Sequence, residues 1–176
     1  MHNIEHRFAT EWRASGRKLS GYAVRFGVET RIGNFVEKVS RCAFDATLAS
    51  GRDVLALVDH DQKSLLARTK SGSLRLRTDE NGLAFDLDLA DTSLSRDVLA
   101  LAERGDLGGM SFGFTVPSGG EVWQGNVREL RAITLYEISV IHSWPAYEGT
   151  SIAARNRADD DGRRQLAIMR RYLETL

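Results

Sequence analysis

The segment from Leu74 to Leu89 alternates apolar and charged residues on both sides of an Asn-Gly pair. Alternation with a period of two is typical of strands that bury one face. Asn81-Gly82 supplies the positive backbone φ angles that a tight hairpin turn requires. The segment is therefore predicted to form a two-stranded antiparallel hairpin with one face in water.

Shorter apolar or alternating stretches predict further strands. In the earliest of them, Tyr22, Val24 and Phe26 recur at period two and are expected to share one face. Several are rich in β-branched and aromatic residues, which favour pleated structure. These strands are predicted at residues 19–26, 54–58, 110–116 and, as one or two strands, 127–141.

Two helices are predicted between the strands. Ser40 is expected to cap a short helix that holds Phe44 and Leu48 and stops at Gly51. Thr92 or Ser93 is expected to cap a second helix that ends at Gly105. The apolar face of this second helix comprises Leu94, Val98, Leu101 and Ala102. Because strands dominate, the predicted fold class is mainly β with peripheral helices (α+β), built as a small closed β-barrel.

The length of 176 residues suits one ordinary hydrophobic core. We expect an N-terminal tail over 1–17 and a folded domain over 18–154. The remaining residues, 155–176, read as a charged linker followed by a basic amphipathic helix. Leu166, Met169, Leu173 and Leu176 recur there at three and four residues.

The charge balance excludes some classes of partner. Lysine plus arginine number 24, as do aspartate plus glutamate, so no overall field attracts nucleic acid or an anionic membrane, and proteins are the expected partners. Cys42 is the single cysteine and cannot form an intramolecular disulfide. No apolar run approaches the roughly 20 residues of a membrane span, and no signal peptide is apparent. The simplest prediction is a soluble cytoplasmic protein.

A serine and a histidine near the ends of predicted strands are the candidates for chemistry. Ser111 is flanked by glycines at 108, 109 and 113, which leave a hydroxyl accessible and backbone N–H groups available for an oxyanion. A serine hydroxyl needs a base, and His60 follows directly on an apolar strand. The string Gly109-Met-Ser-Phe-Gly113 fits the nucleophile-elbow formula, but strand-like residues follow it, which disfavours an α/β-hydrolase.

Four ordered strings carry a resemblance to a known family. They are Leu57-Val-Asp-His-Asp61, Ser71-Gly-Ser-Leu-Arg75, Gly109-Met-Ser-Phe-Gly-Phe114, and Leu135-Tyr-Glu-Ile-Ser-Val140 with Pro145-Ala-Tyr147. Together they resemble the prohead proteases of tailed bacteriophages over roughly residues 19–154. The resemblance implies His60 and Ser111 as the catalytic pair and a helix-ringed barrel similar to the herpesvirus maturation proteases. It also implies cleavage of capsid scaffold segments and often of the protease itself.

Each candidate has a plainer interpretation. His60, between two aspartates, also fits a surface loop, and Ser111 also fits an ordinary strand serine. Asp59 and Asp61 suggest a metal site, but adjacent residues seldom converge on one ion, and no metal or cofactor is expected. The family resemblance favours the catalytic interpretation and favours Ser111 over Ser139 or Ser143.

The residue that orients the base is less clearly marked. Glu137 alternates with Ile133, Leu135, Ser139 and Ile141, so a regular strand places its carboxylate on an apolar face, where it needs a partner. A protonated His60 is such a partner, and Arg131 or water is the alternative. His142 is the second candidate, because the herpesvirus enzymes use a second histidine. Asp59 and Asp61 are weaker candidates because they adjoin His60.

The predicted function is a serine endopeptidase that matures phage proheads in the host cytoplasm. In this mechanism Ser111 is the nucleophile, His60 the general base and Glu137 the orienting carboxylate. Its substrates are expected to be the major capsid protein and scaffold segments, and the chain is a possible homo-oligomer without nucleic-acid or membrane partners. Two alternatives remain, a noncatalytic capsid- or scaffold-binding barrel and a small-substrate serine esterase or amidase.

Overall fold

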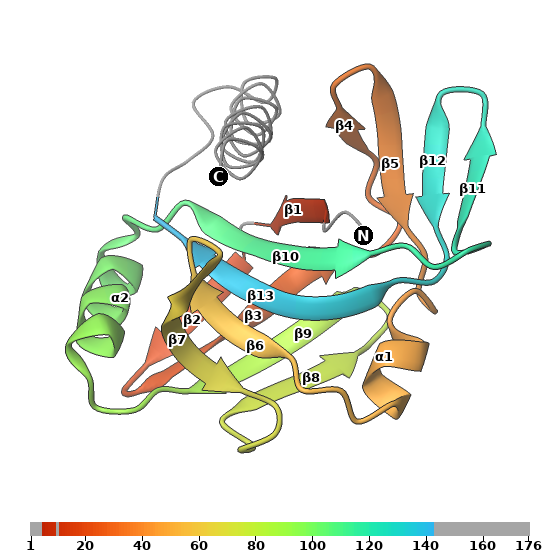
Figure 1. Cartoon of the computed structure of the whole chain (residues 1–176). Coiled ribbons are helices and arrows are strands. Elements are labelled where there is room, and N and C mark those ends of the chain that lie inside the picture. The colour runs from red at the N-terminus through yellow and green to blue at the C-terminus, as the bar shows by residue number, and fades with distance from the viewer. Residues whose placement is uncertain (1–4, 10, 143–176) are drawn as a thin grey trace, which may run out of the picture.

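The computed structural model describes residues 5–9 and 11–142, which form three β-sheets and two helices (Figure 1). Sheet A has the strand order β1-β10-β13-β6-β7. Its strands are β1 (Glu5–Ala9), β10 (Gly109–Thr115), β13 (Thr134–Ile141), β6 (Leu55–Val58) and β7 (Asp61–Arg68). Sheet B has the order β2-β3-β9-β8. Its strands are β2 (Glu11–Ser15), β3 (Lys18–Arg25), β9 (Gly82–Asp88) and β8 (Leu74–Thr78).

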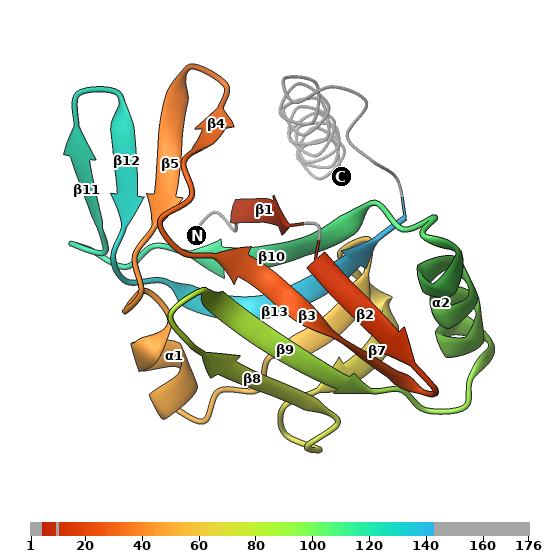
Figure 2. The ribbon, with the colours of Figure 1, turned by 180° about the vertical axis from the view of Figure 1, so that it is seen from behind.

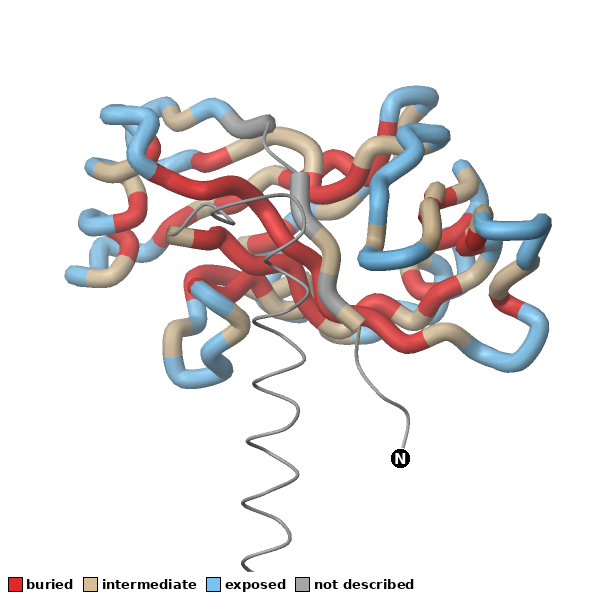
Figure 3. The backbone as a smooth tube through the Cα atoms, turned by 90° about the horizontal axis from the view of Figure 1, so that it is seen from above, coloured by how far each residue is buried: buried red, intermediate tan, exposed pale blue. Residues whose placement is uncertain are grey.

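Sheets A and B pack against each other and enclose the main core, as the front and back views show (Figures 1 and 2). Sheet A contributes Phe112, Ile138 and Val140, and sheet B contributes Leu83 and Phe85, all at most 2% exposed. Buried residues concentrate in the middle of the molecule, while most turns at its periphery are exposed (Figure 3).

The described strands form a two-sheet sandwich rather than the predicted closed barrel. Each of sheets A and B keeps two edge strands, β1 and β7 in one and β2 and β8 in the other. The chain passes between the two sheets at corners from β1 to β2 and from β7 to β8 through residues 69–73, and again from β9 to β10 through residues 89–108. Because the ladders stop at these corners, the hydrogen bonding does not close around the core. The mainly β prediction is confirmed, and the closed barrel is not.

Sheet C stands apart from the sandwich (Figures 1 and 2). Its strand order is β11-β12-β5-β4, with β12 parallel to β5. The strands are β11 (Glu121–Gln124), β12 (Val127–Leu130), β5 (Phe35–Val39) and β4 (Thr30–Ile32). Strands β12 and β13 show that the stretch 127–141 forms two strands, one in each of two sheets.

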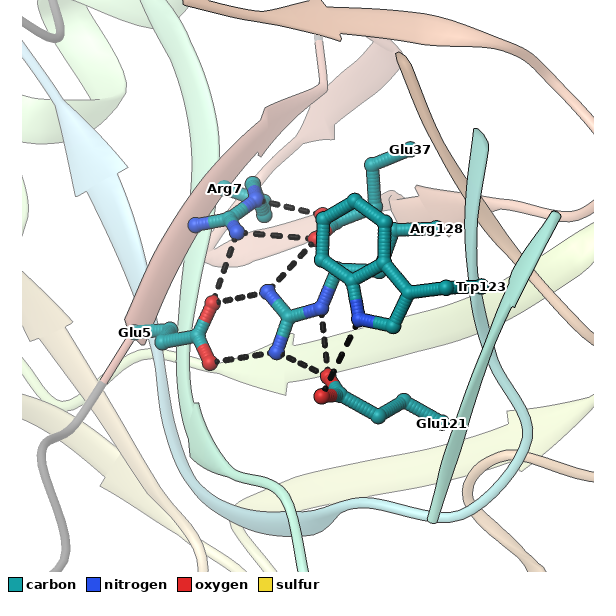
Figure 4. Close-up of polar contacts among 6 residues, drawn as sticks. All are labelled: Glu5, Arg7, Glu37, Glu121, Trp123 and Arg128. Atoms are coloured by element: carbon teal, nitrogen blue, oxygen red, sulfur yellow. Dashed lines mark hydrogen bonds and ion pairs between the residues drawn. The ribbon is translucent and has the colours of Figure 1, made fainter. Parts of the chain in front are cut away.

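A cluster of five charged residues joins sheet C to β1 (Figure 4). The buried Arg128 donates to Glu5 at 2.5 and 2.8 Å, to Glu37 at 3.0 Å and to Glu121 at 2.5 Å. Arg7 of β1 donates to Glu37 at 2.5 and 2.9 Å and to Glu5 at 2.8 Å. We call these five residues the ion cluster. Strands β1 and β2 lie within the stretch predicted as an N-terminal tail, so this part of it belongs to the sandwich.

Both predicted helices are present. Helix α2 (Ser93–Arg104) begins after Thr92, whose side chain accepts from Ser95 N–H at 3.2 Å, and ends at Gly105 with φ 75°. Helix α1 (Asp45–Ala49) lacks the expected Ser40 cap, since its N-cap residue is Phe44 without a side-chain hydrogen bond. Neither of the helices in the described ranges is long and apolar enough to cross a membrane.

The predicted hairpin forms from β8 and β9, but its turn is not the predicted one. Neither Asn81 nor Gly82 has a positive φ. Instead, the Asp79 carboxylate accepts from the backbone N–H groups of both residues, at 2.8 and 3.1 Å. Gly82 is needed for another reason, because a Cβ there would lie 2.0 Å from the carbonyl oxygen of Val24. The glycine therefore permits close approach of β3.

A bulge also changes the face pattern predicted for the first alternating stretch. The register of β3 with β9 shifts between Tyr22 and Val24, so Ala23 is the extra residue. Ala23 and Val24 are both buried, whereas Tyr22 is only half-buried and its hydroxyl donates to Asp79 at 2.8 Å. Tyr22 and Val24 therefore do not share one buried face. Residues 143–176, which include the predicted C-terminal helix, Ser143 and the string Pro145-Ala-Tyr147, lie outside the described residues.

Candidate active site

His60 lies in a two-residue turn between β6 and β7. Val58 pairs with Asp61, and the two residues between them, Asp59 and His60, have φ angles of 48° and 62°. Two consecutive positive φ angles are the pattern of a type I′ hairpin turn, which favours Asn and Gly. Non-glycine residues are unfavourable in this left-handed region. The conformation of His60 therefore depends on contacts that hold the turn.

Strand β13 supplies these contacts. Asp59 N–H donates to the Val140 carbonyl at 2.9 Å, and His60 N–H donates to Ser139 Oγ at 3.2 Å. The Asp59 carboxylate also accepts from His142 N–H at 3.0 Å and lies 2.7 Å from His142 Nδ1. The turn is thus attached to the last residues of β13 through both backbone and side chains.

The imidazole of His60 meets a buried carboxylate. His60 Nδ1 lies 2.8 Å from Glu137 Oε1, and Ser139 Oγ donates to Glu137 Oε2 at 2.5 Å. Glu137 is only 8% exposed. Because a carboxylate accepts hydrogen bonds, Nδ1 carries the proton of a neutral imidazole and Nε2 carries the lone pair. This is the tautomer that a general base needs at Nε2.

A bulge turns Glu137 away from the main core. Gly113 pairs with Glu137 and Phe114 with Leu135, so Tyr136 is the extra residue. Leu135 packs in the core with Ile138, whereas Glu137 bonds with Ser139 on the other face. The predicted alternation, with Leu135 and Glu137 on one face, is therefore wrong. Glu137 does have a histidine as its partner, and Arg131 pairs with Glu129.

Ser111 is on the same face as this hydrogen-bonded group. It lies in the middle of β10, directly opposite Ser139 of β13. Opposite residues of an antiparallel pair project to one face with Cβ atoms about 4.5–5.5 Å apart. Ser111 is 0% exposed, and its Oγ has no hydrogen-bond partner among the described residues. A buried hydroxyl without a partner is uncommon and points to a role other than stability.

The local sequence explains how β10 presents Ser111. Gly109 has φ 143°, which other residues rarely adopt, so the strand begins with a backbone conformation that favours glycine. The strand then continues through Thr115. Ser111 is therefore not part of a nucleophile elbow, as the sequence predicted. It lies within the strand rather than near its end, and its hydroxyl is buried rather than accessible.

The structure brings His60, Glu137 and Ser111 to one face of sheet A and directs His142 elsewhere. His142 pairs with Asp59, and Asp61 bonds with Lys63 and Ser64 of its own strand. Among the residues described, no group of three or more His, Cys, Asp or Glu side chains is placed to hold a metal ion. The arrangement has the parts for proton transfer from a serine through an oriented imidazole.

The sequence identifies Ser139 only as a rival nucleophile to Ser111. Its spacing of two from Glu137 was the available signal, because residues i and i+2 of a strand share a face. The sequence could not reveal that its hydroxyl also contacts the backbone of His60, 79 residues earlier.

Comparison with known protein families identifies the family of this chain. The family model described as caudovirus prohead serine protease matches residues 4–164, which is most of the chain. No curated protein and no solved structure matches the chain. The chain belongs to the caudovirus prohead serine protease family and is a serine peptidase of phage capsid maturation.

Proposed function

We propose that Ser111, His60 and Glu137 form the catalytic triad of this peptidase. The observation that carries the proposal is the hydrogen bond between His60 Nδ1 and Glu137 Oε1 at 2.8 Å, on the face where Ser111 projects opposite Ser139. A carboxylate, an imidazole and a hydroxyl in this relation support base-assisted attack by serine.

The proposed reaction is acyl transfer to Ser111 followed by hydrolysis. His60 Nε2 accepts the hydroxyl proton as Oγ attacks the peptide carbonyl, and then delivers that proton to the leaving amine. Glu137 stabilises the imidazolium that forms between these steps. Water, activated by His60, then cleaves the ester and restores the hydroxyl of Ser111.

The proposed substrates are capsid and scaffold segments in the assembling prohead, within the host cytoplasm, and self-cleavage belongs to the same proposal. The family membership supports this choice of substrate. Ser111 is fully buried, so a peptide reaches it only after part of the covering chain moves. Movements of loops or segments that admit a substrate are common in enzymes.

Coexpression with the major capsid protein of the same phage tests the proposal. Ser111→Ala is expected to abolish capsid-protein cleavage and labelling by a fluorophosphonate probe, because the variant lacks the hydroxyl proposed to attack. Ser64→Ala, at a half-buried position of β7, is the matched control and should cleave normally. The mass spectrum of the products locates the cleaved bonds.

The outcomes separate the alternatives. Unchanged processing by folded Ser111→Ala contradicts the assignment of the nucleophile. Labelling without capsid cleavage, combined with hydrolysis of model esters, would favour the esterase or amidase. Failure of the wild-type protein to label or cleave would favour a noncatalytic binding module.

A further inference from the structure

Ser139 occupies the centre of the hydrogen-bonded group on sheet A. It is 0% exposed. Its hydroxyl accepts from His60 N–H at 3.2 Å and donates to Glu137 Oε2 at 2.5 Å. Its Cβ lies across the strand pair from Ser111. One hydroxyl therefore contacts both the residue proposed as base and the residue proposed to orient it.

We propose that Ser139 is a positioning residue for the reaction, which holds the backbone of His60 and the carboxylate of Glu137 in register with Ser111. The inference rests on the proposed roles of these three residues. It assigns Ser139 no contact with substrate and no proton transfer to substrate.

The bond between His60 N–H and Ser139 Oγ stabilises the strained backbone of the β6–β7 turn. His60 has a φ of 62° without being glycine, so this conformation persists only if the surroundings stabilise it. The bond to Ser139 Oγ uses the N–H of His60 itself. Without it, a partly buried donor loses its partner and the imidazole has a weaker anchor.

The carboxylate contact fixes the plane of Glu137. One oxygen faces His60 Nδ1 and the other faces Ser139 Oγ. The terminal torsion of glutamate is otherwise broad, so a single contact leaves the plane free to rotate. With both oxygens engaged, Oε1 stays directed at the imidazole.

The test compares three variants by the kinetics of fluorophosphonate labelling, separated into a saturable binding constant and a maximal rate constant. Ser139→Ala removes the hydroxyl, and Ser139→Thr keeps it. Thr115→Val is the matched control, because Thr115 is a buried β10 residue whose hydroxyl contacts Tyr136 at 3.3 Å, outside this hydrogen-bonded group. Urea unfolding measures the stability of each variant.

We expect Ser139→Ala to lower the maximal rate constant by about 10- to 100-fold with little change in the binding constant, as expected for loss of a hydrogen bond to a charged group. In the pH–rate profile, the pH at the midpoint of the acid limb should rise. The reason is that a Glu137 carboxylate without its Ser139 donor attracts the imidazolium more strongly. Asp59, Asp61, Lys63 and His142, the other titratable groups near this turn among the described residues, are unchanged in the variant. Ser139→Thr should restore most of the rate, and Thr115→Val should label normally.

Equal labelling by wild type and Ser139→Ala, with an unmoved acid limb, overturns the inference and leaves the triad intact. So does a rate loss in Ser139→Ala that Thr115→Val matches at similar stability, since that marks a structural effect. If Ser139→Thr does not fold, the comparison of Ser139→Ala with Thr115→Val still decides. Absence of labelling in the wild-type protein is a different result, because it refutes the proposed triad itself.

Discussion

Two networks of buried polar side chains involve sheet A, and they differ in how completely their groups are paired. In the ion cluster, the charged groups of Arg7, Glu37 and Arg128 meet opposite charges within 3.0 Å. In the network around Glu137, the bonded group ends beside Ser111, whose hydroxyl has no partner among the described residues.

This difference suggests that the ion cluster contributes to stability and the network around Glu137 to catalysis. A network whose members are fully paired fixes the arrangement of the strands that carry it. An unpaired buried hydroxyl costs about 1–3 kcal/mol instead. Ser111 lies opposite Ser139 of the bonded group, and its proposed role as the nucleophile accounts for this cost. Substitutions in the first network should therefore change stability, and substitutions in the second should change the rate.

The largest expected effect is on the rate. Glu137→Gln keeps the shape of the side chain but removes the charge that stabilises the imidazolium, so labelling and cleavage should fall by about two to four orders of magnitude. In a His60→Ala background the same change should add little, because triad members act as one unit. Rate constants from labelling of the four proteins complete the cycle.

His142→Gln serves as the control for this prediction. His142 pairs with Asp59 in a contact that leaves both side chains more than a third exposed, so we expect a loss of about fivefold or less. Near-normal activity of Glu137→Gln with collapse of His142→Gln would transfer the orienting role to His142.

A smaller effect, on stability, is expected in the ion cluster. Arg128→Met leaves Glu37, which is 3% exposed, with one cation fewer. Removing one partner from a buried ion pair typically destabilises by about 3 kcal/mol. Urea unfolding measures the change, and Arg77→Met, which breaks an exposed pair with Asp86, should cost less than about 1 kcal/mol.

The labelling rate of the folded Arg128→Met protein should remain close to normal. Loss of labelling without loss of stability would contradict the distinction between the two networks.

The sequence predicted the parts of the fold that depend on neighbouring residues. Strand β10, helix α2 and the β8–β9 hairpin all follow from local periodicity and capping. Bulges were not predictable, because the extra residues Ala23 and Tyr136 are defined only by the register with a partner strand. The closed barrel failed for a similar reason, since pairing between edge strands is a property of the whole chain.

In the candidate site, too, the sequence identifies residues in local strings but not the contacts between distant strands. His60 and Ser111 stand in recognisable strings, and Glu137 was marked by a carboxylate in an apolar strand. The backbone strain of His60 and its bond to Ser139 depend on how the β6–β7 turn meets β13. The ion cluster was equally hidden, because Glu5 and Arg128 are 123 residues apart.

The smallest expected effect is the pH dependence that Glu5 gives to the ion cluster. Burial raises the pKa of Glu5, but the hydrogen bond and charge of Arg128, together with Arg7, outweigh it and hold the pKa below its ordinary value of 4.5. A lowered pKa in the folded state means that Glu5 stabilises the fold above pH 4.5, and that this contribution is lost as the pH falls through the folded-state pKa.

Glu5→Gln should therefore destabilise the protein by up to about 1 kcal/mol at pH 7. The difference from wild type should shrink as the pH falls below 4.5, whereas Glu80→Gln, in the exposed β8–β9 turn, should show little difference at either pH. The midpoints of urea unfolding from pH 7 to pH 3 report the stability of both variants. A loss of stability in Glu5→Gln that stays constant across that range would mean that the carboxylate contributes shape rather than charge.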